Sequence, residues 1–155
     1  MARPTIGSPA PDFTLLDQNG VARTLSEFRS APTLIYFYPK DDTPGCTKEA
    51  CLLRDSFPEL SQTNVTVLGI SPDSVQSHKK FAEKYSLPFM LLADTEKEVV
   101  SLYEVWGKKK FMGREYDGVF RTSFLLDKEG KVAKIYENVR PEKHAQEVLE
   151  DLAHV

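Results

Sequence analysis

The sequence lacks any long hydrophobic segment and has no large excess of charge of either sign. Nowhere do about 18 apolar residues follow one another, as a membrane helix requires, and the first residues contain no apolar signal segment. The 20 basic and 23 acidic residues give a net charge of −3, whereas proteins that bind polyanions carry a basic surface. We therefore expect neither a membrane nor a nucleic acid as partner, and we predict a cytoplasmic protein.

Cysteine is also scarce, because the chain contains only Cys46 and Cys51. A chain of 155 residues, 41% of them hydrophobic, can bury a core without a disulfide or a metal. We therefore expect a single domain over residues 1–155. A lasting structural disulfide is not expected in a reducing compartment, so the two cysteines are predicted to be transient redox partners or metal ligands.

The hydrophobic pattern predicts strands that alternate with helices. Two short strands on either side of Asn19-Gly20 predict an N-terminal β-hairpin, and the apolar run 33–38 predicts a central strand covered on both faces. Further strands are predicted at 65–71, 89–93, 122–126 and 131–136, and helices at 46–57, after Asp73, after Thr95 and after Pro141. This order predicts an α/β protein of thioredoxin-like fold, with a central mixed β-sheet flanked by helices on both faces.

Three local features are predicted as well. Residues 73–76 and 95–98 have the pattern of capping boxes that begin helices, and the first of these helices should turn Val75 towards the core. The segment 108–118, which contains three consecutive lysines, is predicted to be a polar, solvated loop.

Cys46 lies at the start of a predicted helix. Unpaired backbone N–H groups and the positive end of the helix dipole favour a thiolate at this position. The acidic side chains nearby outnumber the basic ones and oppose a thiolate, so an arginine from elsewhere should be needed. Sequence spacing alone does not identify this arginine. Arg54, two helical turns past Cys46, would lie roughly 12 Å away along the helix axis.

Helix geometry restricts how the two cysteines can meet. Five residues of helix separate the Cα atoms of Cys46 and Cys51 by roughly 8 to 9 Å, whereas a disulfide needs less than about 7 Å. An intrachain disulfide would therefore require the start of the helix to unwind. Two alternatives stay open: a zinc site, although His78, His144 and His154 lack the spacing of zinc ligands, and a pair of ordinary packing residues.

The segment from Pro39 to Cys51, PKDDTPGCTKEAC, resembles the active-site segment of the peroxiredoxins, and closely that of the bacterioferritin comigratory protein, or Q-type, subfamily. Three more segments are similar to the same subfamily, and together they extend the resemblance over essentially the whole chain. They are Ala10-Pro11-Asp12-Phe13, Gly69-Ile70-Ser71 with Asp73, and the run from Arg121 to Asp127.

The resemblance implies a thiol peroxidase that reduces hydrogen peroxide and organic hydroperoxides to water or alcohols. It implies that Cys46 is the peroxidatic nucleophile and Cys51 the resolving cysteine, which forms an intrachain disulfide with it. A thioredoxin-type dithiol donor would then reduce this disulfide. Neither a cofactor nor a metal is implied. A monomer is favoured, because an intrachain resolving cysteine needs no second subunit.

The resemblance also assigns roles to four residues around Cys46. It implies that Thr43 donates a hydrogen bond to the peroxide and that Pro39 shields the pocket. Arg121 would be the missing cation that stabilises the thiolate and the peroxide oxygens. Glu49 matches a carboxylate that orients the hydrogen bonds of the site.

Two other classes of function remain as alternatives. A general thiol–disulfide oxidoreductase or redox switch fits the fold, but the Cys-x-x-Cys spacing is absent. A non-catalytic binding or holdase module would carry the cysteines incidentally. Rapid peroxide consumption with a dithiol reductant distinguishes the peroxidase from the switch, and loss of activity in Cys46→Ser distinguishes it from the binding module.

Overall fold

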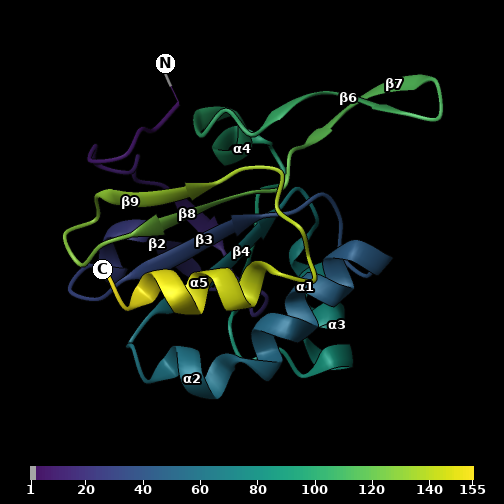
Figure 1. Cartoon of the computed structure of the whole chain (residues 1–155). Coiled ribbons are helices and arrows are strands. Elements are labelled where there is room, and N and C mark those ends of the chain that lie inside the picture. Colours follow the sequence, from purple (N-terminus) through teal and green to yellow (C-terminus); the bar gives the residue numbers. More distant parts are fainter. Residues whose placement is uncertain (1–2) are drawn as a thin grey trace.

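A mixed sheet of seven strands forms the centre of the molecule, and the computed structural model describes residues 3–155 (Figure 1). Its strand order is β2-β1-β5-β4-β3-β8-β9. The strands are β1 (Thr14–Leu16), β2 (Ala22–Thr24), β3 (Thr33–Phe37), β4 (Thr66–Ser71), β5 (Met90–Ala93), β8 (Thr122–Leu126) and β9 (Val132–Tyr136). β3, β4 and β5 are parallel, and the other pairs are antiparallel. The predicted mixed sheet and N-terminal hairpin are confirmed.

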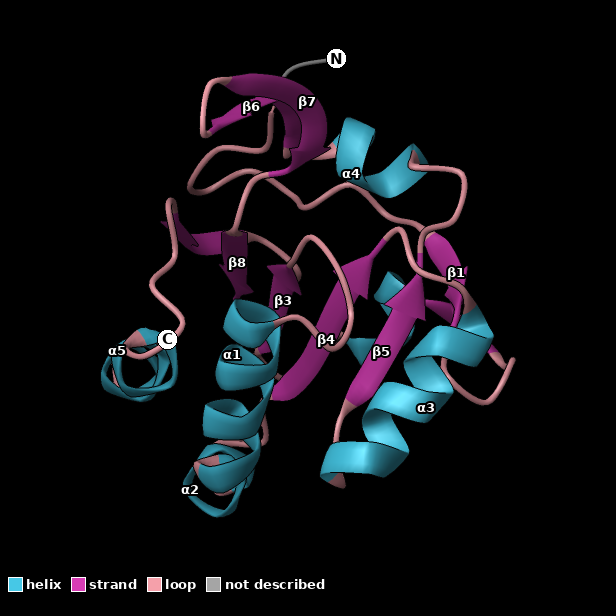
Figure 2. Cartoon of the chain, turned by 90° about the vertical axis from the view of Figure 1, so that its right-hand side faces the viewer, coloured by secondary structure: helices cyan, strands magenta, loops and turns pink. Residues whose placement is uncertain are grey.

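Helices cover both faces of this sheet, as predicted (Figures 1 and 2). They are α1 (Pro44–Asp55), α2 (Phe57–Ser61), α3 (Val75–Tyr85), α4 (Glu98–Leu102) and α5 (His144–Leu152), with a 3-10 turn, η1 (Leu25–Phe28). Residues of α1, α2, α3 and α5 form one hydrophobic core, and residues of α4 and η1 form the other. Among the residues that the structure describes, no helix is both long and apolar enough to cross a membrane.

The central strand β3 is buried along its whole length because its side chains alternate between the two cores. Leu34 and Tyr36 enter the core beneath α1, whereas Ile35 and Phe37 enter the core beneath α4. Gly69 on β4 makes room for this packing, since a Cβ atom there would lie 2.7 Å from the Tyr36 ring. At the C-terminal end of β3 the chain leaves the sheet and leads through a short loop to α1.

The predicted capping box at 73–76 is wrong by one residue. Ser74 caps α3 by accepting the N–H of Ser77 at 3.1 Å, while the Asp73 carboxylate is bonded elsewhere. As a result Val75 is only half-buried, and His78 takes a fully buried position on the inner face of α3.

The predicted capping box at 95–98 is also wrong. The buried carboxylate of Asp94, one residue earlier, accepts the N–H groups of Glu98, Val99 and Val100 at 2.8 to 3.2 Å. One carboxylate thus satisfies three of the N–H groups that a helix start leaves without partners, and it replaces the box.

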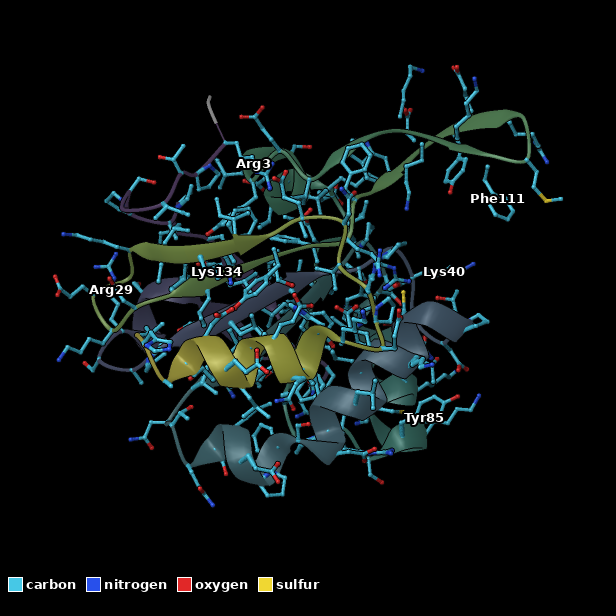
Figure 3. All side chains as sticks on the ribbon, in the orientation of Figure 1. Arg3, Arg29, Lys40, Tyr85, Phe111 and Lys134 are labelled. Atoms are coloured by element: carbon cyan, nitrogen blue, oxygen red, sulfur yellow. The ribbon has the colours of Figure 1, made fainter. Side chains whose placement is uncertain are left out.

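The segment 108–118 is not a loop. It belongs to a two-stranded antiparallel hairpin, β6 (Trp106–Phe111) and β7 (Arg114–Val119), that projects from the body of the molecule (Figures 1 and 3). The Phe111 side chain on this hairpin is 66% exposed. Most of the hairpin faces solvent on both sides, so its sequence lacks the alternation of apolar and polar residues that marks a half-buried strand.

Candidate active site

Cys46 is the third residue of α1 and is buried, with 1% of its surface exposed. Thr43 is the N-cap residue, and the first backbone hydrogen bond of the helix runs from the Thr47 N–H to the Thr43 carbonyl at 2.8 Å. The N–H groups of Gly45 and Cys46 therefore have no acceptor within the helix. They give the surroundings of the thiol a positive electrostatic potential, as predicted for a helix start.

Arg121 is the cation that the structure places beside Cys46. Its Nη2 donates to the Cys46 Sγ at 3.1 Å, and its Nη1 donates to the Glu49 Oε1 at the same distance. The structure thus brings together the thiol, the arginine and the glutamate that the resemblance singled out. Arg54 lies elsewhere, because its guanidinium binds the Tyr85 carbonyl and Asp55.

The register between β3 and β8 explains why Arg121 reaches the thiol. Phe37, the last residue of β3, pairs with Thr122, the first residue of β8. Arg121 precedes that pair and so lies next to the point where the chain leaves β3 towards α1. Two residues 75 positions apart in the sequence become neighbours through one antiparallel strand pair.

Gly45 permits the close approach of the guanidinium. A Cβ atom at this position would lie 2.7 Å from the Arg121 Nη2 and 3.4 Å from its Cζ. Any side chain at position 45 would therefore push the guanidinium away from Cys46. No local sequence pattern indicates this role, because it depends on a contact between distant parts of the chain.

Glu49 is buried, with 1% exposed, and its Oε2 has no hydrogen-bond partner among the described residues. Burial raises the pKa of its carboxyl from 4.5 to about 7, and the Arg121 guanidinium limits this rise. Near neutral pH the carboxyl is therefore part protonated. Its ionisation decides whether the Arg121 guanidinium faces a carboxylate or a neutral carboxyl group beside the Cys46 sulfur.

Thr43 and Pro39 border the loop before α1. The Thr43 hydroxyl donates to the Lys40 carbonyl at 2.9 Å and makes no capping bond to the helix. To donate to a peroxide the hydroxyl would have to turn away from Lys40, whereas its oxygen can accept as it stands. Pro39 is half-buried just beyond the end of β3.

Cys51 lies on the same helix as Cys46 and is half-buried. Both thiols are free, and α1 is continuous from Pro44 to Asp55. The helical separation of roughly 8 to 9 Å between the two Cα atoms therefore applies, and it exceeds what a disulfide spans. The two thiols can bond only if the first turns of α1 open.

Lys109, from the hairpin that was predicted to be a solvated loop, is a second cation within electrostatic range of Arg121 and Cys46. Its Nζ donates to the Val119 carbonyl at 3.0 Å. Burial and the charge of Arg121 lower the pKa of its ammonium group, while Cys46 raises it. Nothing in the run of three lysines distinguishes this one, because its position depends on the fold of the hairpin.

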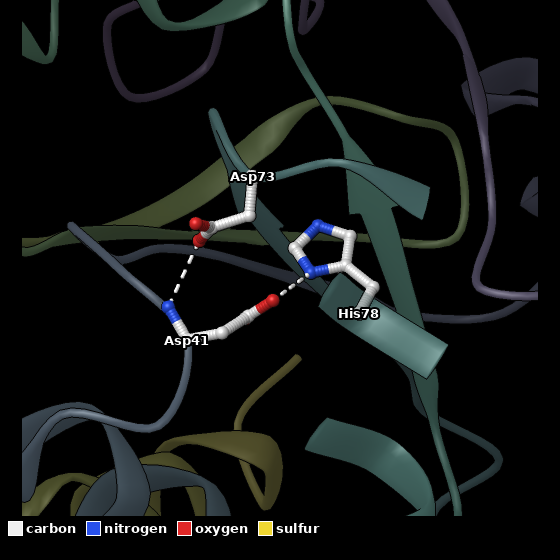
Figure 4. A group of neighbouring side chains, drawn as sticks. All are labelled: Asp41, Asp73 and His78. Carbon is white, nitrogen blue, oxygen red and sulfur yellow. Dashed lines mark hydrogen bonds and ion pairs between the residues drawn. The ribbon is translucent and has the colours of Figure 1, made fainter. Parts of the chain in front are cut away.

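Asp41, Asp73 and His78 form the one group of potential metal ligands among the described residues, with ligand atoms within 4.8 Å of one another (Figure 4). Each of the three is already bonded within the protein. The His78 Nδ1 lies 2.7 Å from an Asp41 oxygen, and an Asp73 oxygen accepts the Asp41 N–H at 2.8 Å. Protein hydrogen bonds account for this group without a metal. Neither cysteine belongs to it.

A model of the AhpC/TSA family matches residues 6–135. Peroxiredoxin Bcp of Bacillus subtilis is 44% identical over 147 residues, which cover 95% of this chain and 94% of the relative. Peroxiredoxin Bcp of Escherichia coli K12 is 46% identical, with 92% of each chain covered. The chain belongs to the AhpC/TSA family. Among the peroxiredoxins of this family it is of the Bcp type, as the resemblance had indicated.

Solved structures of peroxiredoxins share the fold. The peroxidoxin BcpB of Mycobacterium tuberculosis superimposes with a TM-score of 0.87 at 35% identity and 99% coverage of both chains. The bacterioferritin comigratory protein of Xanthomonas campestris, studied for alkyl peroxide reduction, gives a TM-score of 0.89 at 32% identity, covering 97% of this chain and 98% of that one. The thioredoxin-like fold predicted for this peroxiredoxin is confirmed.

We predict that burial of Glu49 makes the stability of the protein depend on pH. A carboxyl whose pKa is raised by folding stabilises the folded state at a pH below its ordinary pKa. This stabilisation is lost as the pH rises through the pKa that the carboxyl has in the folded protein. The free energy of unfolding of the wild type, relative to Glu49→Gln, should fall by roughly 3 kcal/mol between pH 4 and pH 8. Urea denaturation of both proteins measures this difference. If the difference does not change with pH, the carboxyl ionises near its ordinary pKa.

We also predict that Gly45→Ala separates stability from reactivity. Alanine favours the helix by up to about 1 kcal/mol, whereas the displaced guanidinium weakens its bond to buried Glu49, so the free energy of unfolding should change little. The displaced guanidinium should nevertheless slow the reaction of the reduced protein with peroxide at least about tenfold, the effect of losing one charged hydrogen bond. Stopped-flow kinetics under single-turnover conditions measures the rate. The exposed variant Lys48→Ala should react within about twofold of the wild type, and an equal rate for Gly45→Ala would exclude this role of the glycine.

Proposed function

We propose that this peroxiredoxin reduces hydrogen peroxide and organic hydroperoxides with Cys46 as the nucleophile and Cys51 as the resolving cysteine. The observation that carries this proposal is the 3.1 Å contact between the Arg121 guanidinium and the Cys46 sulfur at the start of α1. A thiol that meets both a helix N-terminus and a guanidinium has the surroundings of a reactive cysteine.

In the first step the Cys46 thiolate attacks one oxygen of the peroxide in line with the O–O bond. The S–O bond forms as the O–O bond breaks, and the leaving oxygen takes the electron pair and a proton to become water or an alcohol. Arg121 and the free N–H groups of Gly45 and Cys46 stabilise the negative charge that develops on the oxygens. Thr43 contributes a hydroxyl to the same pocket, and Pro39 limits the access of water to it.

In the second step the Cys51 thiolate attacks the sulfenic acid of Cys46. The S–S bond forms, the S–O bond breaks, and the oxygen leaves as water after taking a proton. This step requires the first turns of α1 to unwind, because the intact helix holds the sulfurs apart. An external dithiol of the thioredoxin type then reduces the disulfide and is itself oxidised. We propose that the enzyme acts as a monomer, since both cysteines lie on one chain.

The proposed substrates include organic hydroperoxides as well as hydrogen peroxide. The similar protein from Xanthomonas campestris is described by its alkyl peroxide reduction activity. A redox switch, which peroxide would oxidise without turnover, is the second candidate function. The one observation that favours it is that α1 must unwind before Cys46 and Cys51 can bond.

We predict that Cys46→Ser abolishes peroxide reduction, because a serine hydroxyl remains protonated at neutral pH and is a far weaker nucleophile. The loss should be at least about a thousandfold, on the scale of removing a nucleophile. Peroxide consumption in the presence of a dithiol donor measures it. If the variant retains most of the activity, Cys46 is not the nucleophile.

We predict that Cys51→Ser still reduces one equivalent of peroxide but loses turnover with a thioredoxin-type donor. The sulfenic acid forms as in the wild type, but it has no partner for a disulfide. Mass spectrometry of the intact protein after one equivalent of peroxide should show a sulfenic adduct in the variant and a link between Cys46 and Cys51 in the wild type. Full turnover of the variant with this donor would show that Cys51 does not resolve.

A further inference from the structure

The loop that leads from β3 to Cys46 is fastened to the body of the protein at Asp41. Its buried carboxylate accepts hydrogen bonds from the Tyr38 hydroxyl at 2.5 Å and from the Ser77 hydroxyl at 2.8 Å, and it contacts the His78 Nδ1 at 2.7 Å. Ser77 and His78 belong to α3. A residue five positions before the reactive cysteine is thus held by side chains from outside the active site.

The contact between Asp41 and His78 is a short hydrogen bond, as the placement of the two imidazole hydrogens indicates (Figure 4). The His78 Nε2 lies 3.0 Å from the Leu92 carbonyl, which can only accept, so this nitrogen carries a hydrogen. A second proton must lie between Nδ1 and the Asp41 carboxylate, because two unprotonated atoms would repel each other at 2.7 Å. Both ring nitrogens of His78 are therefore hydrogen-bonded, and the contact with Asp41 is a buried hydrogen bond.

The main chain is fastened at the same place. The Asp41 N–H donates to the Asp73 carboxylate at 2.8 Å, and this carboxylate also accepts the Ser71 hydroxyl at 2.6 Å. Ser71 ends β4, so the loop before α1 is attached to the neighbouring central strand as well as to α3. The loop cannot move at Asp41 without breaking several buried hydrogen bonds.

Asp42, the next residue, provides a second attachment at the surface. Its two carboxylate oxygens accept the Lys84 ammonium at 2.8 Å and the Tyr85 hydroxyl at 3.0 Å, both from the last turn of α3. Its backbone has a φ of +58°, which is unfavourable for a residue with a side chain. These contacts compensate for that conformation and direct the chain into Thr43 and the first turn of α1.

We propose that Asp41 and Asp42, with their partners Tyr38, just after β3, Asp73, and the side chains of α3, form a latch that sets the balance between the intact and the unwound start of α1. Tyr38, Ser77 and His78 are positioning residues in this proposal. Unwinding that extends back to Asp41 has to break these buried hydrogen bonds, so the latch favours the intact helix. The inference rests on the proposed function, because it concerns the step that joins Cys46 to Cys51.

The latch then determines how sensitive the enzyme is to excess peroxide. The sulfenic acid of Cys46 has two fates: Cys51 attacks it after unwinding, or a second peroxide adds another oxygen to the sulfur as its O–O bond breaks, giving sulfinic acid and water or an alcohol. A tight latch prolongs the exposure of the sulfenic acid. A weakened latch should speed disulfide formation and protect the enzyme against over-oxidation.

Tyr38→Phe tests the latch, and Tyr136→Phe is its matched control. Each change removes one hydroxyl that donates to a carboxylate, to Asp41 in the first case and to Asp151 on α5 in the second. In Tyr38→Phe the peroxide concentration that over-oxidises half of Cys46 should rise about tenfold, the effect of one hydrogen bond to a charged group. In the control it should stay within about twofold of the wild type. Mass spectrometry detects the sulfinic acid.

A second readout needs no peroxide. Amide hydrogen exchange at residues 43–50 of the reduced protein should be about tenfold faster in Tyr38→Phe and unchanged in Tyr136→Phe. Equal exchange and equal over-oxidation in the two variants would overturn the latch. Failure of the wild type to react with peroxide would instead overturn the proposed function, and the exchange experiment would still decide whether the latch exists.

The exposed part of the latch gives a test that leaves the core intact. Lys84→Ala removes the ammonium from Asp42, and Lys80→Ala removes an exposed lysine of the same helix that has no bond to the loop. Lys84→Ala should speed exchange at residues 43–50 roughly twofold, as expected for a surface ion pair, and Lys80→Ala should not. Slower exchange at these residues in Lys84→Ala would contradict the latch, whether or not Tyr38→Phe folds.

Discussion

The structure of the site depends on one guanidinium that donates hydrogen bonds to both a thiol and a carboxyl group. Arg121 donates to the sulfur of Cys46 and to the carboxylate of Glu49, each at 3.1 Å. The strand pairing of β3 with β8 brings this arginine to the end of the sheet, and Gly45 leaves it the space to approach. The position of the thiol on α1 would be of little use without this cation, because the acidic side chains of the preceding loop oppose a thiolate.

Sharing one cation couples the ionisation of the groups around it. With the pKa of Glu49 raised to about 7, the carboxyl is neutral at lower pH, and the Arg121 guanidinium then faces a neutral group beside the Cys46 sulfur. At higher pH the guanidinium also balances the charge of the Glu49 carboxylate. Lys109 adds positive charge from the hairpin at a distance, and burial lowers the pKa of its own ammonium group. Arg121 thus offsets part of the cost of burying the Glu49 carboxylate.

The sequence predicted those elements that a local pattern of residues indicates. The buried strand at 33–38 is a continuous apolar run, and the cysteine at the start of a helix follows from proline, glycine and a polar loop. The hairpin of β6 and β7 escaped prediction because solvent covers both of its faces. Arg121 was identified only through the resemblance, and the bond between Asp41 and His78 joins residues 37 positions apart, so no local pattern indicates it.

The start of α1 has to satisfy two conflicting requirements. In the proposed mechanism it holds the thiol against Arg121 for the reaction with peroxide, yet it has to open before Cys46 can reach Cys51. Its intrinsic stability is low, since Thr43 makes no capping bond with its side chain and Gly45 disfavours the helix. The contacts of Asp41 with its buried partners act from outside the helix and offset this weakness. A helix start that is weak in itself and fastened from outside can open in one small segment while the rest of the fold stays intact.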